Sequence, residues 1–224
     1  MARRKDALLL GNGINYLSEN FVLWTDILRR LAKDIHHAEI MHFVDKKPFT
    51  LIYEEIIFKS KSIVKSSEIE IKRKVAKLVY EIKTNNFHQE ILNSRFKHII
   101  TTNYDYALER SSSEKAEKSN VKNETKYNLF RRKQLNSKYI WHIHGESDVP
   151  NSITLGNEQY AGQLQKMRNY ATANRTTKSR NVSPFKLNNT RFDTDGSIYF
   201  WLDVFLRDNI HILGLSLDYT EIDL

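Results

Sequence analysis

The sequence contains no cysteine, which excludes disulfides and every zinc site built on thiolate ligands. Long hydrophobic runs are also missing. After the basic residues 3–5, the apolar run 7–10 stops at a glycine and is too short for the core of a signal peptide. No other stretch approaches the length that crosses a membrane. We therefore expect a cytoplasmic protein with no membrane partner.

Charge is unevenly distributed, and acidic residues are absent from residues 161–191. The net charge is +8; residues 161–191 hold seven Lys or Arg, and residues 111–138 hold eight Lys or Arg against three Glu. Both segments are rich in polar residues and show weak apolar periodicity. We predict polar basic insertions, as long loops or irregular structure, around 111–138 and 161–198.

The length of the chain suits a single domain over residues 1–224, which carries these basic insertions and a helical insertion around 35–95. Short apolar runs end abruptly at Gly or polar residues, as buried strands do, at 7–10, 96–100, 139–143 and 210–213, with a shorter candidate at 152–155. Helical spacing occurs between these runs, at 21–31, 50–58 and 69–92. The alternation predicts an α/β fold with a Rossmann-like, mostly parallel sheet flanked by helices. Ligands of such sheets bind beyond the carboxyl ends of the strands.

A glycine pair, Gly11-Asn12-Gly13, follows the first predicted strand. A loop of this kind between a strand and a helix lets backbone amides approach phosphate oxygens, and a dinucleotide is a natural ligand. The full GxGxxG fingerprint fails because Tyr16 occupies its third position, and a Walker A lysine is absent. A purely structural tight turn is the alternative.

The second predicted strand ends in Thr101-Thr102-Asn103-Tyr104-Asp105. Two hydroxyls, a carboxamide and a carboxylate are unusually dense for five residues. A helix cap by Thr102 or Asn103 is the structural alternative, but a cap uses only one of these groups. The segment is therefore a candidate for contacts with a ligand.

The third strand ends in Trp-His-Ile-His-Gly at 141–145, and strand alternation places His142 and His144 on one face. His144 stands nearest the strand end and is suited to proton transfer near neutral pH. We interpret His142 as a core histidine that bonds to the backbone. A metal pair completed by Glu146 or Asp148 is the rival interpretation.

The fourth strand is followed by Gly214-Leu215-Ser216-Leu217, where the glycine permits close approach and Ser216 offers a hydroxyl. Alone, this is a common strand-to-loop turn. It gains meaning from the other three segments, since all four follow strands whose ends should meet at one edge of the sheet.

In chain order, these motifs resemble those of the SIR2 superfamily. Gly-Asn-Gly-Ile-Asn at 11–15 resembles the sirtuin GAGIS loop, and the TTNYD segment 101–105 resembles TQNID. His144-Gly145 resembles the catalytic HG, and residues 214–216 resemble the late GTS. The spellings are similar to those of bacterial SIR2-like domains of anti-phage defence systems. An AbiH-like abortive-infection protein has a similar GNG start and a later HIHG. Typical deacetylase sirtuins carry a cysteine zinc ribbon, so protein deacetylation is not expected of this chain.

The resemblance implies hydrolysis of NAD+ to nicotinamide and ADP-ribose, without a metal. It implies that Asn103 orients the ribose or the attacking water and that His144 is the general base. The loops would bind the pyrophosphate, the ribose and the adenosine half of NAD+ through Gly11, Asn12, Gly13, Ile14, Asn15, Thr102, Asp105, Gly145, Gly214, Ser216 and Leu217.

Two other functions are compatible with the sequence. One is a non-catalytic regulatory module that binds NAD+ or ADP-ribose. The other is a nucleic-acid-binding defence subunit that uses the basic insertions, because phosphate neutralisation dominates such binding. A toxic NADase must be restrained, so we also expect a homo-oligomer or a partner defence protein such as an ATPase or nucleic-acid sensor.

Overall fold

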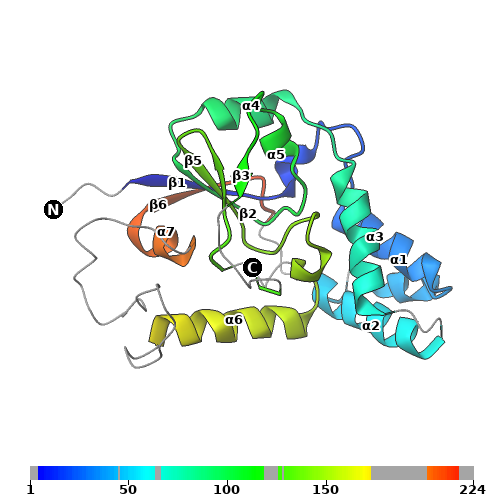
Figure 1. Ribbon diagram of the computed structural model, residues 1–224. Helices are drawn as coiled ribbons and strands as arrows, with labels where there is room; N and C mark the ends of the chain where they lie inside the picture. Colours follow the sequence, from blue (N-terminus) through cyan, green and yellow to red (C-terminus); the bar gives the residue numbers. More distant parts are fainter. Residues whose placement is uncertain are drawn as a thin grey trace.

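A six-stranded sheet in the order β3-β4-β5-β2-β1-β6 forms the centre of the protein (Figure 1). The computed structural model describes residues 5–44, 46–63, 67–118, 126–127, 129–172 and 201–216. The parallel strands are β1 (Asp6–Leu10), β2 (His98–Thr101), β5 (Lys138–His142) and β6 (Asn209–Leu213). They coincide with the four apolar runs of the sequence. The predicted Rossmann-like α/β fold with a mostly parallel sheet is confirmed.

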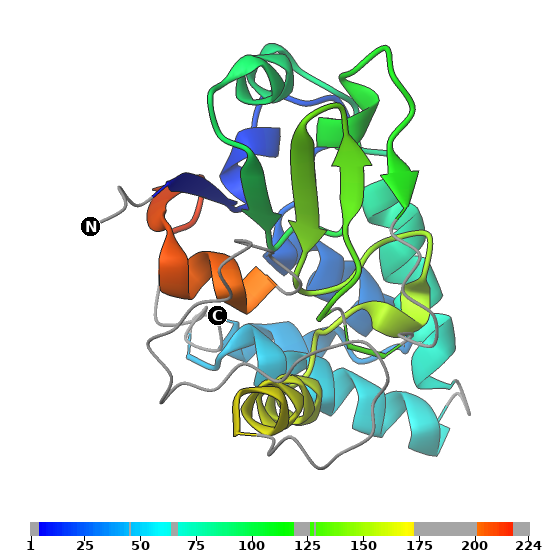
Figure 2. The same ribbon diagram turned by 60° about the vertical axis from the view of Figure 1, so that its left-hand side comes forward.

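The strands β1, β2 and β5 are largely apolar because helices cover both faces of the sheet, whereas the edge strand β6 is mostly exposed. On one face, Leu8, Ile99 and Ile140 pack with α4 (Asn86–Asn93) and α5 (Ala107–Arg110). The opposite face packs against α7 (Trp201–Arg207) through Leu9 and Trp141. Figure 2 shows α4 on one side of the sheet and α6 (Asn157–Thr172) and α7 on the other.

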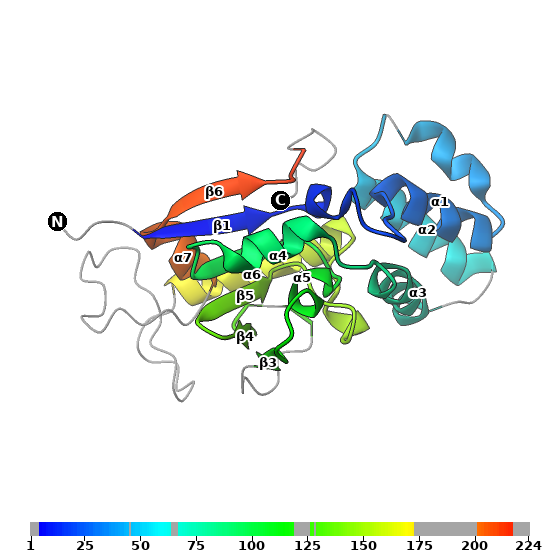
Figure 3. The ribbon, with the colours of Figure 1, turned by 90° about the horizontal axis from the view of Figure 1, so that it is seen from above.

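A separate helical layer lies beyond the carboxyl ends of β1 and β6 (Figure 3). It consists of α1 (Trp24–Asp34), α2 (Phe49–Ile63) and α3 (Glu68–Tyr80), which share one core cluster. The amphipathic face predicted over 21–31 supplies α1's buried Ile27, Leu28 and Leu31. Short 3₁₀ helices occur at Asn12–Asn15, Ala38–Phe43 and Pro150–Ser152.

The basic segments contain more regular structure than the sequence indicates. Within 111–138, β3 (Glu117–Lys118) and β4 (Lys133–Leu135) extend the sheet in antiparallel fashion beyond β5. Within 161–198, residues 161–172 continue α6, and residues 173–198 lie outside the described part. The prediction of irregular structure is therefore wrong for β3, β4 and residues 161–172. These elements depend on contacts with segments distant in the sequence, which local patterns do not show.

Two smaller expectations also change. The shorter strand candidate at 152–155 is wrong, since Pro150–Ser152 is a 3₁₀ helix and residues 153–155 belong to no strand. The predicted helix over 69–92 is two helices, α3 and α4. They are separated because Asn85 caps α4 by accepting hydrogen bonds from the amides of Phe87 and His88.

None of the helices in the described residues is long and apolar enough to span a membrane.

Candidate active site

The four predicted loops leave the sheet at one edge because the strand ends are in register. Leu10 pairs with Thr101 on one side and with Leu213 on the other, and Thr101 pairs with His142. The order of the strands changes direction at β1, which has the later β2 on one side and the last strand β6 on the other. Open α/β sheets bind their ligands at such a switch point.

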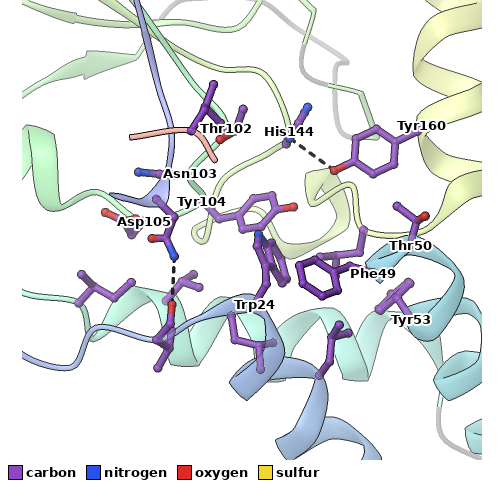
Figure 4. Close-up of a pocket in the computed structure, with 18 residues that line it drawn as sticks. Trp24, Phe49, Thr50, Tyr53, Thr102, Asn103, Tyr104, Asp105, His144 and Tyr160 are labelled. Carbon is purple, nitrogen blue, oxygen red and sulfur yellow. Dashed lines mark hydrogen bonds between the residues drawn. The ribbon is translucent and has the colours of Figure 1, made fainter. Parts of the chain in front are cut away.

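A cavity of about 90 Å³ lies between these loops and the helical layer, and we call it the four-loop cavity (Figure 4). Each of the four loops contributes to its wall, together with α1, α2, α3 and α6. Its lining residues are Asn12, Val22, Trp24, Ile27, Leu28, Phe49, Thr50, Tyr53, Val79, Ile82, Thr102, Asn103, Tyr104, Asp105, His144, Leu155, Tyr160 and Leu215.

The first and last loops are joined directly by backbone hydrogen bonds. The amide of Gly11 donates to the oxygen of Leu213 at 2.9 Å, and that of Gly13 donates to the oxygen of Gly214 at 2.8 Å. A Cβ atom on Gly11 would come within 2.4 Å of that same Gly214 oxygen. The two glycines thus allow loop-to-loop contact, and a phosphate could reach their amides only by replacing these hydrogen bonds.

A polar network behind the first loop fixes the orientation of Asn15. Since Nδ1 of His88 accepts from the backbone amide of Asn85, its Nε2–H donates to Oδ1 of Asn15 at 2.8 Å. The Asn15 amide then donates to Oδ1 of Asn12 and, at 2.9 Å, to Oδ2 of Asp105. Burial lowers the pKa of His88 to about 4, so this histidine is neutral near pH 7.

The second loop is tied to the first through Asn103. Its carboxamide nitrogen donates to the oxygen of Gly11 at 3.3 Å, and its backbone amide donates to Oγ1 of Thr101 at 3.1 Å. In the described residues, the carboxamide oxygen of Asn103 has no hydrogen-bond partner. Asp105, rather than Thr102 or Asn103, bonds to the start of α5, through the amide of Ala107.

His144 lies at the cavity with a neutral imidazole. Burial lowers its pKa to about 3. Its Nδ1 is 3.5 Å from the Tyr160 hydroxyl, and Nε2 has no hydrogen-bond partner within the described part of the chain. Gly145 follows at φ +104°, where a Cβ would lie 2.3 Å from the oxygen of Ser152. The glycine therefore allows the chain to turn immediately after His144.

His142 has different partners from His144. Its Nδ1 contacts the backbone oxygen of Asn103, as the core interpretation predicts, and its Nε2 contacts Glu109, both at 2.7 Å. Glu146, the expected alternative metal ligand, forms an ion pair with Arg131 and accepts a hydrogen bond from Tyr106. Among the residues described, no group of three or more potential ligands is arranged to hold a metal ion.

The structure separates the predicted residues into three groups. Asn12, Thr102, Asn103, Asp105 and His144 line the cavity. The second group does not line the cavity and comprises Gly11, Gly13, Ile14, Asn15, Gly145, Gly214 and Ser216. The third is Leu217, which lies outside the described residues.

The sequence interpretation missed His88 and Tyr160, and it did not include Trp24 among the site residues. Trp24 lines the cavity in edge-to-face contact with Tyr104, with ring centroids 5.4 Å apart. Tyr160 lies on α6, directly before the segment 161–198 in which the sequence showed weak periodicity. His88 contacts Asn15 across a long sequence separation, so no local spacing could have indicated its role.

The geometry defines an open, Rossmann-like α/β sheet with polar loops at the switch point of its strand order. Residues 97–185 match the family model of the SIR2-like domain, which supports the SIR2-like superfamily, a superfamily of NAD-dependent enzymes. The match includes the second and third loops, with Asn103 and His144. No curated protein matches the chain.

Proposed function

We propose that the chain is an NAD+ hydrolase that releases nicotinamide and ADP-ribose. The observation that carries this proposal is the convergence of all four loops on one cavity that holds both Asn103 and His144. The SIR2-like match supports NAD as the substrate, because SIR2-like domains use NAD.

The reaction breaks the bond between the ribose C1′ and the nicotinamide nitrogen, and the electron pair leaves with nicotinamide. The nicotinamide ring is already cationic in NAD+ and becomes neutral when it takes this electron pair, so no strong general acid is required. Water forms the new bond at C1′, and one proton of that water must be removed. The positive charge that develops on the ribose is typical of glycosidic cleavage.

His144 supplies the proton acceptor in this scheme. Its imidazole is neutral near pH 7, and Nε2 is the nitrogen without a described partner, since Nδ1 faces Tyr160. The low pKa that burial imposes makes it a weak base in the structure described. A nearby developing positive charge would disfavour its protonation further, so the proton must pass onward to solvent.

Asn103 supplies the orienting group. The contact of its carboxamide nitrogen with Gly11 leaves the carboxamide oxygen available to accept a hydrogen bond from water or a ribose hydroxyl. Positioning of this kind lowers the barrier because the reactants no longer have to find their orientation in solution.

The cavity must widen for this reaction. Its volume of about 90 Å³ is smaller than the roughly 300–1,000 Å³ of most small-molecule sites. The apolar wall, with Trp24, Phe49 and Leu215, suits an aromatic ring. Because the Gly11 and Gly13 amides already donate to carbonyls, we propose that the pyrophosphate is bound by other groups or by displacement of those bonds.

The direct test is incubation of the purified chain with NAD+, with detection of nicotinamide. We expect turnover that is lost in His144→Ala and Asn103→Ala. His211→Ala is the matched control, because His211 is exposed on β6 and contacts Asp6 rather than the cavity. Thermal unfolding of each variant separates loss of activity from loss of fold. NAD+ binding without nicotinamide release in the wild type would instead favour a regulatory module.

We further propose that this activity serves anti-phage defence, with oligomerisation or a partner protein controlling it. The support is the resemblance of the loop spellings to bacterial defence domains. Depletion of cellular NAD+ during phage infection, dependent on His144, would be the expected result. Protection from phage that persists in His144→Ala cells would contradict this role.

A further inference from the structure

A buried ion pair lies directly beneath the second loop, outside the wall of the four-loop cavity. His142, the last residue of β5, is 3% exposed and sits between the backbone of Asn103 and the carboxylate of Glu109 on α5. Glu109 is also buried, at 6% exposed. Neither side chain lines the cavity, so neither can be assigned to substrate contact.

The two partners of His142 define its protonation state. Nδ1 faces a carbonyl oxygen and Nε2 faces a carboxylate oxygen, each at 2.7 Å, and both of these oxygens only accept hydrogen bonds. Both ring nitrogens must therefore carry protons, which makes the ring an imidazolium. Burial disfavours this charge, but the contact with Glu109 and the nearby charge of Glu146 together outweigh it and raise the pKa of His142.

Further charges surround this pair, all from neighbouring elements. Glu146 favours the imidazolium, whereas Lys133 on β4 opposes it. The Tyr106 ring meets the His142 ring edge to face, with centroids 5.3 Å apart. The pair is thus enclosed on its sides by polar and aromatic groups from β4, the loop after β5 and the start of α5.

Among the hydrogen bonds of Asn103, the one that its backbone oxygen accepts from His142 is the shortest. The bonds from its own amides to Thr101 and Gly11 are 3.1 and 3.3 Å, compared with 2.7 Å from His142. A charged donor gives a stronger hydrogen bond than a neutral one. A buried ion pair often adds little net stability over an apolar replacement.

We propose that His142 and Glu109 form a positioning pair that fixes the backbone of Asn103, and through it the carboxamide, for reaction with NAD+. This inference rests on the proposed hydrolase function. His142 donates to the loop, and Glu109 keeps His142 charged and aligned. The two histidines of this strand end therefore have opposite states: His142 is charged and holds the loop, while His144 is neutral and lines the cavity.

Two substitutions of His142 separate positioning from general structural damage. The amide of Asn can replace Nδ1, which faces Asn103, whereas the amide of Gln can replace Nε2, which faces Glu109. We compare H142N in combination with Glu109→Gln against H142Q alone. His98→Gln is the control for placing Gln in the sheet, because His98 is a buried histidine on β2 outside the cavity wall.

We expect H142Q to lower kcat by about 100-fold with little change in KM, the loss typical of a displacement of about 1 Å at a reacting group. The H142N/E109Q variant should regain most of that loss, and His98→Gln should keep kcat. Equal kcat losses in H142Q and H142N/E109Q would overturn the proposal, as would a wild-type kcat in H142Q.

A second measurement does not depend on turnover. Nitrogen-15 NMR of the full chain should show both ring nitrogens of His142 protonated near pH 7, and the side-chain amide signals of Asn103 should shift in H142Q but not in H142N/E109Q. A neutral His142 ring, or Asn103 signals unchanged in H142Q, would reject the positioning pair. If these signals behave as expected but the wild type releases no nicotinamide, the hydrolase proposal has failed instead.

Discussion

The backbone amide of Gly13 donates a hydrogen bond to the carbonyl oxygen of Gly214 at 2.8 Å, which joins the loops after β1 and β6. Gly214 has φ +74°, a conformation that favours glycine, and a Cβ on it would lie 2.9 Å from the amide nitrogen of Ile14. The glycines that suggest a phosphate loop in the sequence thus have a structural use in this protein.

Replacing Gly214 by alanine should therefore destabilise the fold by about 1–3 kcal/mol, since it adds backbone strain and a close contact. Urea denaturation measures the effect. Ser216→Ala, at an exposed position in the same loop, should change the free energy of unfolding by less than about 0.5 kcal/mol. A Gly214→Ala protein as stable as the wild type would show that the two loops separate easily.

Asn85 connects the start of α4 to the first loop, and its loss should affect both. Its side chain accepts hydrogen bonds from the amides that begin α4 and donates to the oxygen of Ile14 and the hydroxyl of Ser18. We expect Asn85→Ala to cost about 2 kcal/mol in unfolding free energy, the upper part of the range for caps. Asn93→Ala, at the exposed end of the same helix, is the matched control in the same denaturation experiment.

Stability should fall as the pH drops below about 6.5, because three buried histidines resist protonation. The pKa values of His88 and His98 are lowered to about 4 and that of His144 to about 3, chiefly by burial. Their folded-state pKa values are below the unfolded value, so the unfolded state binds more protons between these limits. Each of these three histidines should lower the free energy of unfolding by about 1 kcal/mol between pH 6 and pH 5. Asp105, whose pKa burial raises, acts in the opposite direction in the acid part of this range.

His98→Phe tests this pH dependence without altering the cavity. Phenylalanine can preserve the stacked contact with Tyr139, in which the ring centroids are 5.3 Å apart. The difference in unfolding free energy between pH 7 and pH 5 should be about 2 kcal/mol smaller in the variant than in the wild type. An identical pH dependence in both proteins would mean that folding does not change the pKa of His98.

Trp24 should contribute to NAD+ affinity through the apolar wall of the cavity. We expect Trp24→Ala to weaken binding about 10-fold, which corresponds to about 1.4 kcal/mol and is within the range of one aromatic contact. Calorimetry in an Asn103→Ala background avoids turnover during the measurement. Phe58→Ala, at a position on α2 that is 71% exposed, should bind NAD+ like its parent.

The strands and the polar edge could be predicted from sequence because both depend on local patterns. Each apolar run ends at a glycine or a polar cluster, and these runs predict the positions of β1, β2, β5 and β6. The contacts of β4 and α6 could not be predicted in the same way. Lys133 on β4 contacts Glu146, and Gln163 on α6 donates to the backbone oxygen of Ile143. The positions of β4 and α6 therefore depend on segments that are distant in the sequence.

The histidines illustrate the same limit within the site. His144 was indicated by its place beside a glycine at a strand end. His88 has no such local signal, and its partner Asn15 is far away in the chain. The sequence suggested that His142 bonds to the backbone, which is confirmed, but it gave no indication of Glu109 as the second partner.

The four-loop cavity lies at a seam between separately packed cores. The helices α1, α2 and α3 share one apolar cluster, whereas the two faces of the sheet have clusters of their own. Tyr104, Ile153 and Leu155 connect the loops of the sheet to the helical cluster. Opening along this seam leaves the other contacts of each core intact, and a dinucleotide seated there would bridge both sides. Ligand binding would then be measurable as slower amide hydrogen exchange in α1 and α2, without a matching change in the strands of the sheet.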